Sequence, residues 1–263
     1  MLAYSSNMSE IITDYADHFD CEWYRDTYYG SVCVEGALGK VVKFDLDNYH
    51  AIFQSGKVKG KRLLDIGTGP CVHTIMSACR HVDDIYLSDY TAQNRKALTD
   101  WWKSDKTMLE NITEYILRME NSGETVAERQ KTMKGKVRAV LPIDVTQTKP
   151  LGTGCDVTEF DIITSSLCLE AASRTLELYR RHAGNVTPLL KKGGHFILNG
   201  TLGESWYRVG DKKFASLNLT KEDIESTYVS CGFDVISLKH GASSEGGNFS
   251  DYHGYFVMHA IKK

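Results

Sequence analysis

Two glycines and two aspartates at fixed spacing are the first residues in this sequence that could do chemistry. The stretch from Leu63 to Pro70 (LLDIGTGP) places a glycine turn directly after apolar residues that suit a buried strand, and an amphipathic run from Val72 to Cys79 follows. Strand, tight glycine turn and helix form the first unit of a nucleotide-binding α/β sheet. Glycine is needed in such a turn because its backbone reaches positive φ and lets a ligand come close.

This turn differs from the dinucleotide-binding fingerprint, which would need a third glycine where Val72 stands, and it has no Lys to hold phosphates. An acid followed by G-x-G, here Asp65 and the glycines, resembles instead the first motif of S-adenosylmethionine (SAM)-dependent methyltransferases. Asp89 ends the next expected strand, 20 residues after Gly69, the spacing at which an acid accepts hydrogen bonds from ribose hydroxyls. The alternative for the glycine turn is a plain strand-to-helix turn, and the alternative for Asp89 is a solvated Asp at the end of a strand.

The composition is that of an ordinary folded chain. Of the 263 residues, 42% are hydrophobic and 25% are charged, and the net charge of −3 argues against a general nucleic-acid binder, which would need a basic face. No run approaches the roughly 18 apolar residues of a membrane helix, and the first residues carry acids without the apolar core of a signal peptide. The seven cysteines are scattered, so the sequence predicts no metal site, no disulfide framework and a cytoplasmic location.

Alternating strand and helix patterns predict one domain over residues 1–263, with a helical cap or lid at 1–57 and an α/β core at 58–263. The expected helices are Glu10–Tyr29, Leu38–Gln54, Val72–Cys79, Gln93–Trp102, Thr107–Lys134, Thr175–Leu190 and one that Thr220 caps together with Asp223. The expected strands are Leu63–Ile66, Asp84–Asp89, Val137–Ile143, Phe160–Ser165, His195–Asn199, Phe233–Leu238 and Gly254–Ile261. This order implies a mostly parallel seven-stranded sheet flanked by helices, with a hairpin-like pair at the C-terminus.

The first expected helix is crowded with aromatic residues, among them Trp23, Tyr24, Tyr28 and Tyr29. Their rings either bury a cap on the sheet or form a lid over the cofactor, where aromatic faces attract a sulfonium cation. The composition leaves both interpretations open.

Further motifs occur in register along the chain. They are Asp65–Pro70, Ser77–Cys79, Asp89–Tyr90 with Asn94, Ile143–Thr146 with Pro150–Gly152, Leu167–Ala171, Leu189–His195 and Glu204–Tyr207. Together they resemble the small-molecule N-methyltransferases, the family of the nicotinamide, indolethylamine (thioether) and phenylethanolamine N-methyltransferases. The resemblance runs from about Tyr15 to the C-terminus.

This resemblance implies the SAM-dependent methyltransferase (Rossmann-like) fold, with SAM as cofactor and S-adenosylhomocysteine as product. Tyr24 and Tyr29 match lid tyrosines, and His73 replaces an aromatic hydroxyl that is usually Tyr. The cofactor-binding residues implied in this way are Tyr24, Tyr29, Gly67, Thr68, Gly69, His73, Asp89, Tyr90, Asn94, Asp144, Val145 and Ser166.

The substrate side separates the branches of the family. Acids near the amine in the phenylethanolamine branch match Glu170, Glu204 and Asp251, while the nicotinamide branch has an Asp where this chain has Gly200. Ser216 matches a serine of the nicotinamide site. The resemblance implies Glu170 and Glu204 as catalytic carboxylates within a substrate site of Tyr28, Glu170, Glu204, Tyr207, Ser216 and Asp251.

Acids in the acceptor site favour an amine over a pyridine. An alkylamine is mostly protonated at neutral pH, so carboxylates can bind the ammonium and relay its proton away, whereas a pyridine nitrogen needs no such base. We therefore expect a SAM-dependent N-methyltransferase that acts on a small amine, as a monomer without nucleic-acid or membrane partners. The alternatives are a nicotinamide or pyridine N-methyltransferase, a catalytically silent SAM-binding protein and a nicotinamide-dependent oxidoreductase.

Overall fold

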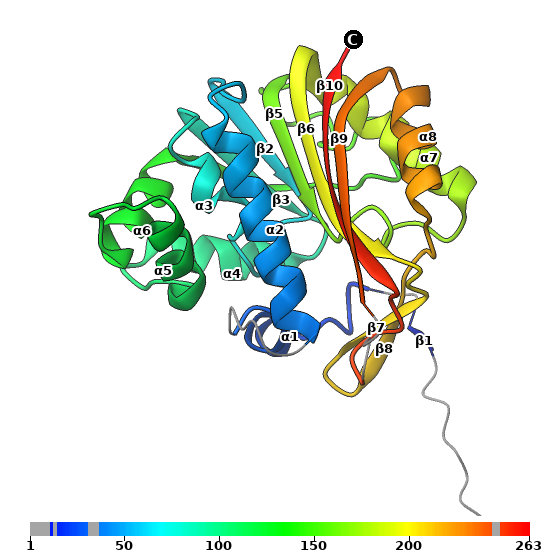
Figure 1. The fold of residues 1–263 in the computed structure, drawn as a ribbon, viewed down its shortest axis with the longest axis horizontal. Coiled ribbons are helices and arrows are strands. Elements are labelled where there is room, and N and C mark those ends of the chain that lie inside the picture. The colour runs from blue at the N-terminus through cyan, green and yellow to red at the C-terminus, as the bar shows by residue number, and fades with distance from the viewer. Residues whose placement is uncertain (1–10, 13–14, 31–36, 244–247) are drawn as a thin grey trace, which may run out of the picture.

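A seven-stranded sheet forms the centre of the computed structural model, which describes residues 11–12, 15–30, 37–243 and 248–263. The strand order is β4-β3-β2-β5-β6-β10-β9, and helices cover both faces (Figure 1). The strands of this sheet are β2 (Arg62–Ile66), β3 (Asp84–Asp89), β4 (Val137–Pro142), β5 (Phe160–Ser166), β6 (Leu190–Leu202), β9 (Phe233–Ala242) and β10 (Gly254–Lys262). The helices are α1 (Cys21–Tyr28), α2 (Ala37–Gln54), α3 (Thr74–Ala78), α4 (Ala92–Lys103), α5 (Glu110–Met119), α6 (Val126–Lys136), α7 (Leu176–Val186) and α8 (Lys221–Ser230).

The pairing of the strands confirms the predicted mostly parallel sheet. Strands β4, β3, β2, β5 and β6 pair in parallel, and β10 runs antiparallel to both β6 and β9. The expected C-terminal pair is therefore present, with the last strand inserted between β6 and β9. The carboxyl ends of β2, β3, β4 and β5 lie at one edge, where an open α/β sheet binds its ligand.

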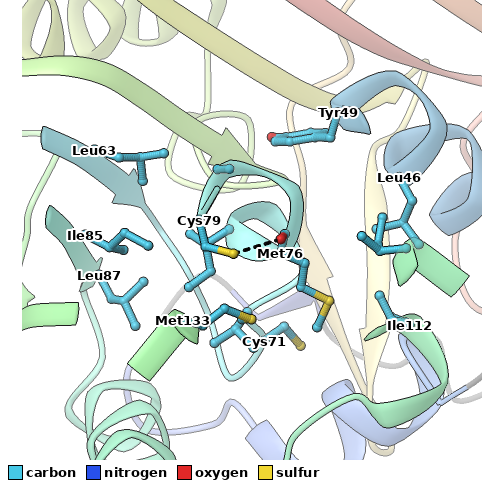
Figure 2. Close-up of a cluster of buried hydrophobic side chains, with 14 of the residues drawn as sticks. Leu46, Tyr49, Leu63, Cys71, Met76, Cys79, Ile85, Leu87, Ile112 and Met133 are labelled. Carbon is cyan, nitrogen blue, oxygen red and sulfur yellow. Dashed lines mark hydrogen bonds between the residues drawn. The ribbon is translucent and has the colours of Figure 1, made fainter. Parts of the chain in front are cut away.

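Both faces of the sheet are buried, which explains why apolar residues stand next to one another in the central strands, as Leu63 and Leu64 do in β2 and Ile162 and Ile163 do in β5. Neighbouring residues such as Leu63 and Leu64 belong to opposite core clusters. On one face Leu46 and Tyr49 of α2 pack in the same cluster as Met76 of α3 (Figure 2). The other face is covered by α7 and α8. This packing fixes α2 against the sheet.

The N-terminal segment differs from the expected helix Glu10–Tyr29. Ile11–Ile12 form strand β1, which pairs in parallel with β8 (Lys212–Ala215), and the helix begins only at Cys21. Asp20 is the N-cap of this helix, because its side chain accepts a hydrogen bond from the backbone N–H of Trp23 at 3.0 Å. Glu10 and residues 13–14 of the prediction lie outside the described residues.

Two other predicted elements were wrong in extent. The long helix Thr107–Lys134 is interrupted because Asn121 takes a positive φ of 48°, after which Thr125 and Glu128 form a capping box that starts α6. The helix Thr175–Leu190 ends at Val186 and continues as the short 3-10 turn η1 (Thr187–Leu189).

A small second sheet of order β1-β8-β7 lies beside the main one, and it was not predicted (Figure 1). Strand β7 (Trp206–Val209) and β8 form an antiparallel hairpin that packs under the N-terminal segment, where Phe19 contacts Phe214. None of the helices in the described part of the chain is long and apolar enough to cross a membrane.

Candidate active site

The glycine turn after β2 has the geometry that its sequence predicts. Gly67 and Gly69 take φ values of 66° and 63°, a region that favours glycine. A Cβ on Gly67 would also overlap the Sγ of Cys168, so the close approach of these two segments requires glycine there. The backbone N–H of Gly69 donates to Oδ2 of Asp89 at 2.8 Å, which links the turn directly to the predicted ribose acid.

Asp89 is a buried carboxylate held by a cluster of donors. Its Oδ1 accepts hydrogen bonds from the backbone N–H of Thr91 at 2.8 Å and from Nδ2 of Asn94 at 3.1 Å. Burial raises the pKa of Asp89, while these hydrogen bonds act in the opposite direction. Asn94 does not line the large cavity described below, and its Nδ2 holds Asp89 in place.

Asp65, the acid that marks the first motif, lies beneath the turn. Its Oδ1 accepts from Thr164 of β5 at 2.6 Å and its Oδ2 accepts from Thr74 of α3 at 2.9 Å. Burial raises the pKa of Asp65 to about 6, and it is not among the residues that line the cavity. Its carboxyl therefore joins two strands and a helix and supports the loop from below.

A cavity of about 390 Å³ opens above this loop. Every predicted cofactor residue except Asn94 lines it: Tyr24, Tyr29, Gly67, Thr68, Gly69, His73, Asp89, Tyr90, Asp144, Val145 and Ser166. Burial lowers the pKa of His73 to about 3, so the imidazole is neutral. Its ring lies 4.5 Å from that of Tyr29, its Nε2 lies 3.3 Å from Oγ of Ser166, and its Nδ1 has no partner among the described residues. One ring nitrogen is thus left for a ligand.

A second, smaller cavity of about 60 Å³ adjoins the first. Five of the six predicted substrate residues line it: Tyr28, Glu170, Glu204, Tyr207 and Ser216. Tyr15, Tyr24, Tyr29, Leu167 and Ala171 line both cavities and form their common wall.

Two buried glutamates dominate the small cavity. Glu170 is 2% exposed, and its Oε1 has no hydrogen-bond partner among the described residues. Burial, together with the negative charge of Glu204, raises the pKa of Glu170 to about 8. Glu204 accepts a hydrogen bond from Ser250 at 2.5 Å, and burial raises its pKa against the effect of such hydroxyl donors. Glu170 can therefore hold or accept a proton near neutral pH.

Gly200 on β6 leaves the space that Glu170 occupies. A Cβ at this position would overlap Oε1 of Glu170 and would lie 3.0 Å from the ring of Phe256. From the sequence, Gly200 is only a position at which the nicotinamide branch has an acid, whereas in the structure this glycine makes room for a neighbouring side chain. It is the absence of a side chain here that admits the carboxyl of Glu170.

Asp251, the sixth predicted substrate residue, does not line the cavity. Its side chain accepts hydrogen bonds from the backbone N–H groups of Ser205 and Trp206, at 2.8 and 3.1 Å, and from the Ser205 hydroxyl. These bonds lower the pKa of Asp251 against the effect of burial. Its carboxylate is thus engaged in fixing the start of β7, which differs from the predicted substrate contact.

Sequence reasoning missed one acid of the small cavity, Asp45. The spacing of Val42, Leu46, Tyr49 and Phe53 marks the buried face of α2, and Asp45 falls on that face. An Asp among apolar positions of a helix is the signal that could have found it, since Asp is rarely buried without a partner. The aromatic lining residues Tyr15 and Tyr252 carried no comparable signal. Within the described ranges no group of three His, Cys, Asp or Glu side chains could hold a metal ion.

Comparison with known proteins relates this geometry to characterised relatives. The NNMT/PNMT/TEMT family model matches residues 9–263. Phenylethanolamine N-methyltransferase from Macaca mulatta is 36% identical over 190 residues, which cover 71% of this chain and 67% of that protein. Nicotinamide N-methyltransferase from Homo sapiens is 31% identical over 250 residues, with 94% of each chain covered. A SAM-dependent methyltransferase structure from Methanosarcina mazei has a TM-score of 0.56 at 13% identity, with 80% of this chain and 96% of that chain covered, which shows a shared fold.

Proposed function

The chain belongs to the NNMT/PNMT/TEMT family and is a SAM-dependent small-molecule N-methyltransferase, and on this premise we propose that its acceptor is an amine held by Glu170 and Glu204. The observation that carries this choice is the pair of buried carboxyls in the small cavity, one of them with an open oxygen. Arg, Lys and His are missing from the described residues that line this cavity, so the amine would be the cation that meets these acids.

SAM fits the large cavity by the chemistry of its lining. Asp89 would accept hydrogen bonds from the ribose hydroxyls, the backbone around Gly67 and Gly69 would approach the methionine part, and Asp144 with Val145 would meet the adenine. SAM supplies a methyl group on a sulfonium, which aromatic faces such as those of Tyr24 and Tyr29 attract. No metal is needed for such a transfer.

With SAM bound in the large cavity, the methyl group would pass the wall shared by the two cavities to an acceptor nitrogen in the small one. SAM would supply the methyl group and keep the electron pair of the S–C bond as a neutral thioether, while the amine lone pair would form the new N–C bond. Glu170 or Glu204 takes the proton that the amine must lose to expose its lone pair. The protein mainly aligns and desolvates the reactants, an effect worth about 7–11 kcal/mol in well-oriented reactions.

A panel of methyl acceptors tests this proposal. Radiolabelled methyl transfer from SAM should be faster to primary and secondary amines than to nicotinamide, pyridines or thioethers, and Glu170→Gln should lower kcat/KM for amines by about 10²–10⁴-fold, the usual share of a general base. A matched control is Glu177→Gln, because this acid lies in the first turn of α7 and does not line the cavity. If the wild-type enzyme preferred nicotinamide, the nicotinamide branch would be supported instead. The presence of Ser216 in the cavity is the observation that favours this alternative.

Four further assignments belong to the same proposal. We propose that residues 1–57 act as a lid on a core of 58–263 within one domain, that the enzyme is a monomer in the cytoplasm, and that nucleic acid is not a partner. The net charge of −3 supports the absence of a nucleic-acid partner. The free thiols of the six described cysteines suit a reducing compartment such as the cytoplasm. Sedimentation equilibrium and fractionation of cells that express the chain would test the oligomeric state and the location.

A further inference from the structure

Asp45 is a third buried carboxyl in the acceptor cavity, and the proposed reaction does not use it. It is 5% exposed, it lines the cavity from α2, and its Oδ1 has no hydrogen-bond partner among the described residues. Burial raises the pKa of Asp45 and the charge of Glu170 adds to this rise, just as burial and the charge of Glu204 raise the pKa of Glu170. The small cavity therefore contains three acids, of which two have an open acceptor atom.

The side chain of Asp45 is held in place by an amide. Its Oδ2 accepts a hydrogen bond from Nδ2 of Asn199 at 2.8 Å, and Oδ1 of that amide accepts from the hydroxyl of Tyr49 at 3.0 Å. Asp45 and Tyr49 are four residues apart on one face of α2, so the helix holds both sides of the Asn199 amide. Tyr49 is itself packed in the core, as Figure 2 shows. This arrangement directs one oxygen of Asp45 to Asn199 and leaves the other without a partner in the part of the chain that the structure describes.

A cation is what this open oxygen lacks. Burying a carboxylate without a counter-charge is costly, so burial raises the pKa of Asp45, and a bound cation would allow this carboxyl to ionise. The described lining supplies no such cation, since it offers only acids, hydroxyls, tyrosine rings and apolar groups. Tyrosine rings and carboxylates together are the usual surroundings of a bound ammonium. A single ammonium at Glu170 and Glu204 would leave Asp45 unpaired, whereas an acceptor with two ammonium groups would pair with acids at both ends.

We propose that the acceptor is a small diamine, with Glu170 and Glu204 facing the amino group that is methylated and Asp45 binding the second, unreactive ammonium. This inference rests on the proposed amine N-methyltransferase function. Only one amino group enters the transfer: its nitrogen forms the N–C bond, sulfur keeps the electrons of the S–C bond, and a carboxylate takes the proton. Asp45 is thus a specificity-determining residue that acts on binding and orientation.

Matched acceptors and matched variants test the proposal. Methyl transfer from SAM would be measured with a series of short α,ω-diamines and with monoamines of equal chain length. The wild-type enzyme should prefer the best diamine by at least about tenfold in kcat/KM, since one buried charge pair distinguishes the two acceptors. Asp45→Asn should reduce this ratio by at least about tenfold, mainly through the KM of the diamine, because only the diamine has a second ammonium to pair with Asp45. Asp47→Asn is the control, because Asp47 lies on the same helix but pairs with Lys43 and Tyr115 outside the cavity.

The outcomes separate this inference from the function on which it rests. Equal or better use of monoamines by the wild-type enzyme would overturn the diamine assignment while leaving amine methylation intact, and this comparison needs no variant to fold. An equal loss for diamine and monoamine in Asp45→Asn would show a purely structural role. If no amine of either kind were methylated but nicotinamide were, the proposed function itself would fail.

Discussion

Binding of a simple monoamine should release protons in an amount that the raised pKa of Glu170 determines. With a pKa of about 8, roughly nine tenths of the Glu170 carboxyls carry a proton at pH 7 and about one tenth at pH 9. A free alkylammonium with a pKa near 10 is almost fully protonated at pH 7 and about nine tenths protonated at pH 9. If the bound amine and Glu170 share one proton, binding at pH 7 releases about 0.9 proton, and binding at pH 9 releases almost none.

Titration calorimetry of enzyme saturated with S-adenosylhomocysteine gives this number directly. The amine is titrated at each pH in buffers of different ionisation enthalpy, and the slope of the observed heat against that enthalpy is the proton count. Glu170→Gln should lose most of the release at pH 7, because no carboxyl at that position remains to ionise. A wild-type release near zero at both pH values would refute the reasoning, since Glu170 would then already be ionised in the free protein.

Three further predictions concern the cofactor, the acceptor space and the lid. Asp89→Ala should weaken binding of S-adenosylhomocysteine by roughly 1–3 kcal/mol, because the donors around Asp89 and the ribose lose their acceptor; unchanged affinity by calorimetry would contradict the ribose assignment. Gly200→Ala should push Glu170 aside, which would lower kcat/KM for amines by at least about tenfold and the free energy of unfolding by about 1–3 kcal/mol while cofactor affinity holds; normal amine kinetics would show that the carboxyl can move without loss. Hydrogen exchange across residues 15–30 should slow when S-adenosylhomocysteine and an amine are added, and equal exchange with and without ligands would make this segment a fixed cap.

The main sheet could be predicted from sequence because its signals are local. Strands β2 and β5 each contain adjacent apolar residues, since both faces of the sheet are covered, and β2 is followed directly by the glycine turn. The prediction for the N-terminal segment was wrong for the opposite reason, because the signal there is not local. Ile11–Ile12 form a strand only because β8, about 200 residues later, offers an edge, and no pattern near Ile11 reports that partner. The β7–β8 hairpin did carry a readable signal, a two-residue loop that starts with Gly210 at positive φ.

The candidate site likewise contains residues that could be predicted from the sequence and residues that could not. The residues of the cofactor loop and Asp89 follow from strand-end positions and spacing, and the structure brings them to one cavity. The roles of Asp45 and Gly200 depend on contacts between segments that are far apart in the chain. Asp45 meets Asn199 across 154 residues, and the value of Gly200 lies in a neighbour, Glu170, that its own surroundings in the sequence do not reveal.

The missing side chain at Gly200 also constrains how this pocket can evolve. An acid introduced there would collide with the carboxyl of Glu170, so a side chain at position 200 and the present position of Glu170 exclude one another in a single pocket. Neither position can change alone without consequence, because a side chain at position 200 displaces an intact Glu170, and shortening Glu170 alone removes the carboxyl that we propose as the base. The two positions should therefore be strongly epistatic, so that the effect of a side chain at position 200 depends on the residue at position 170.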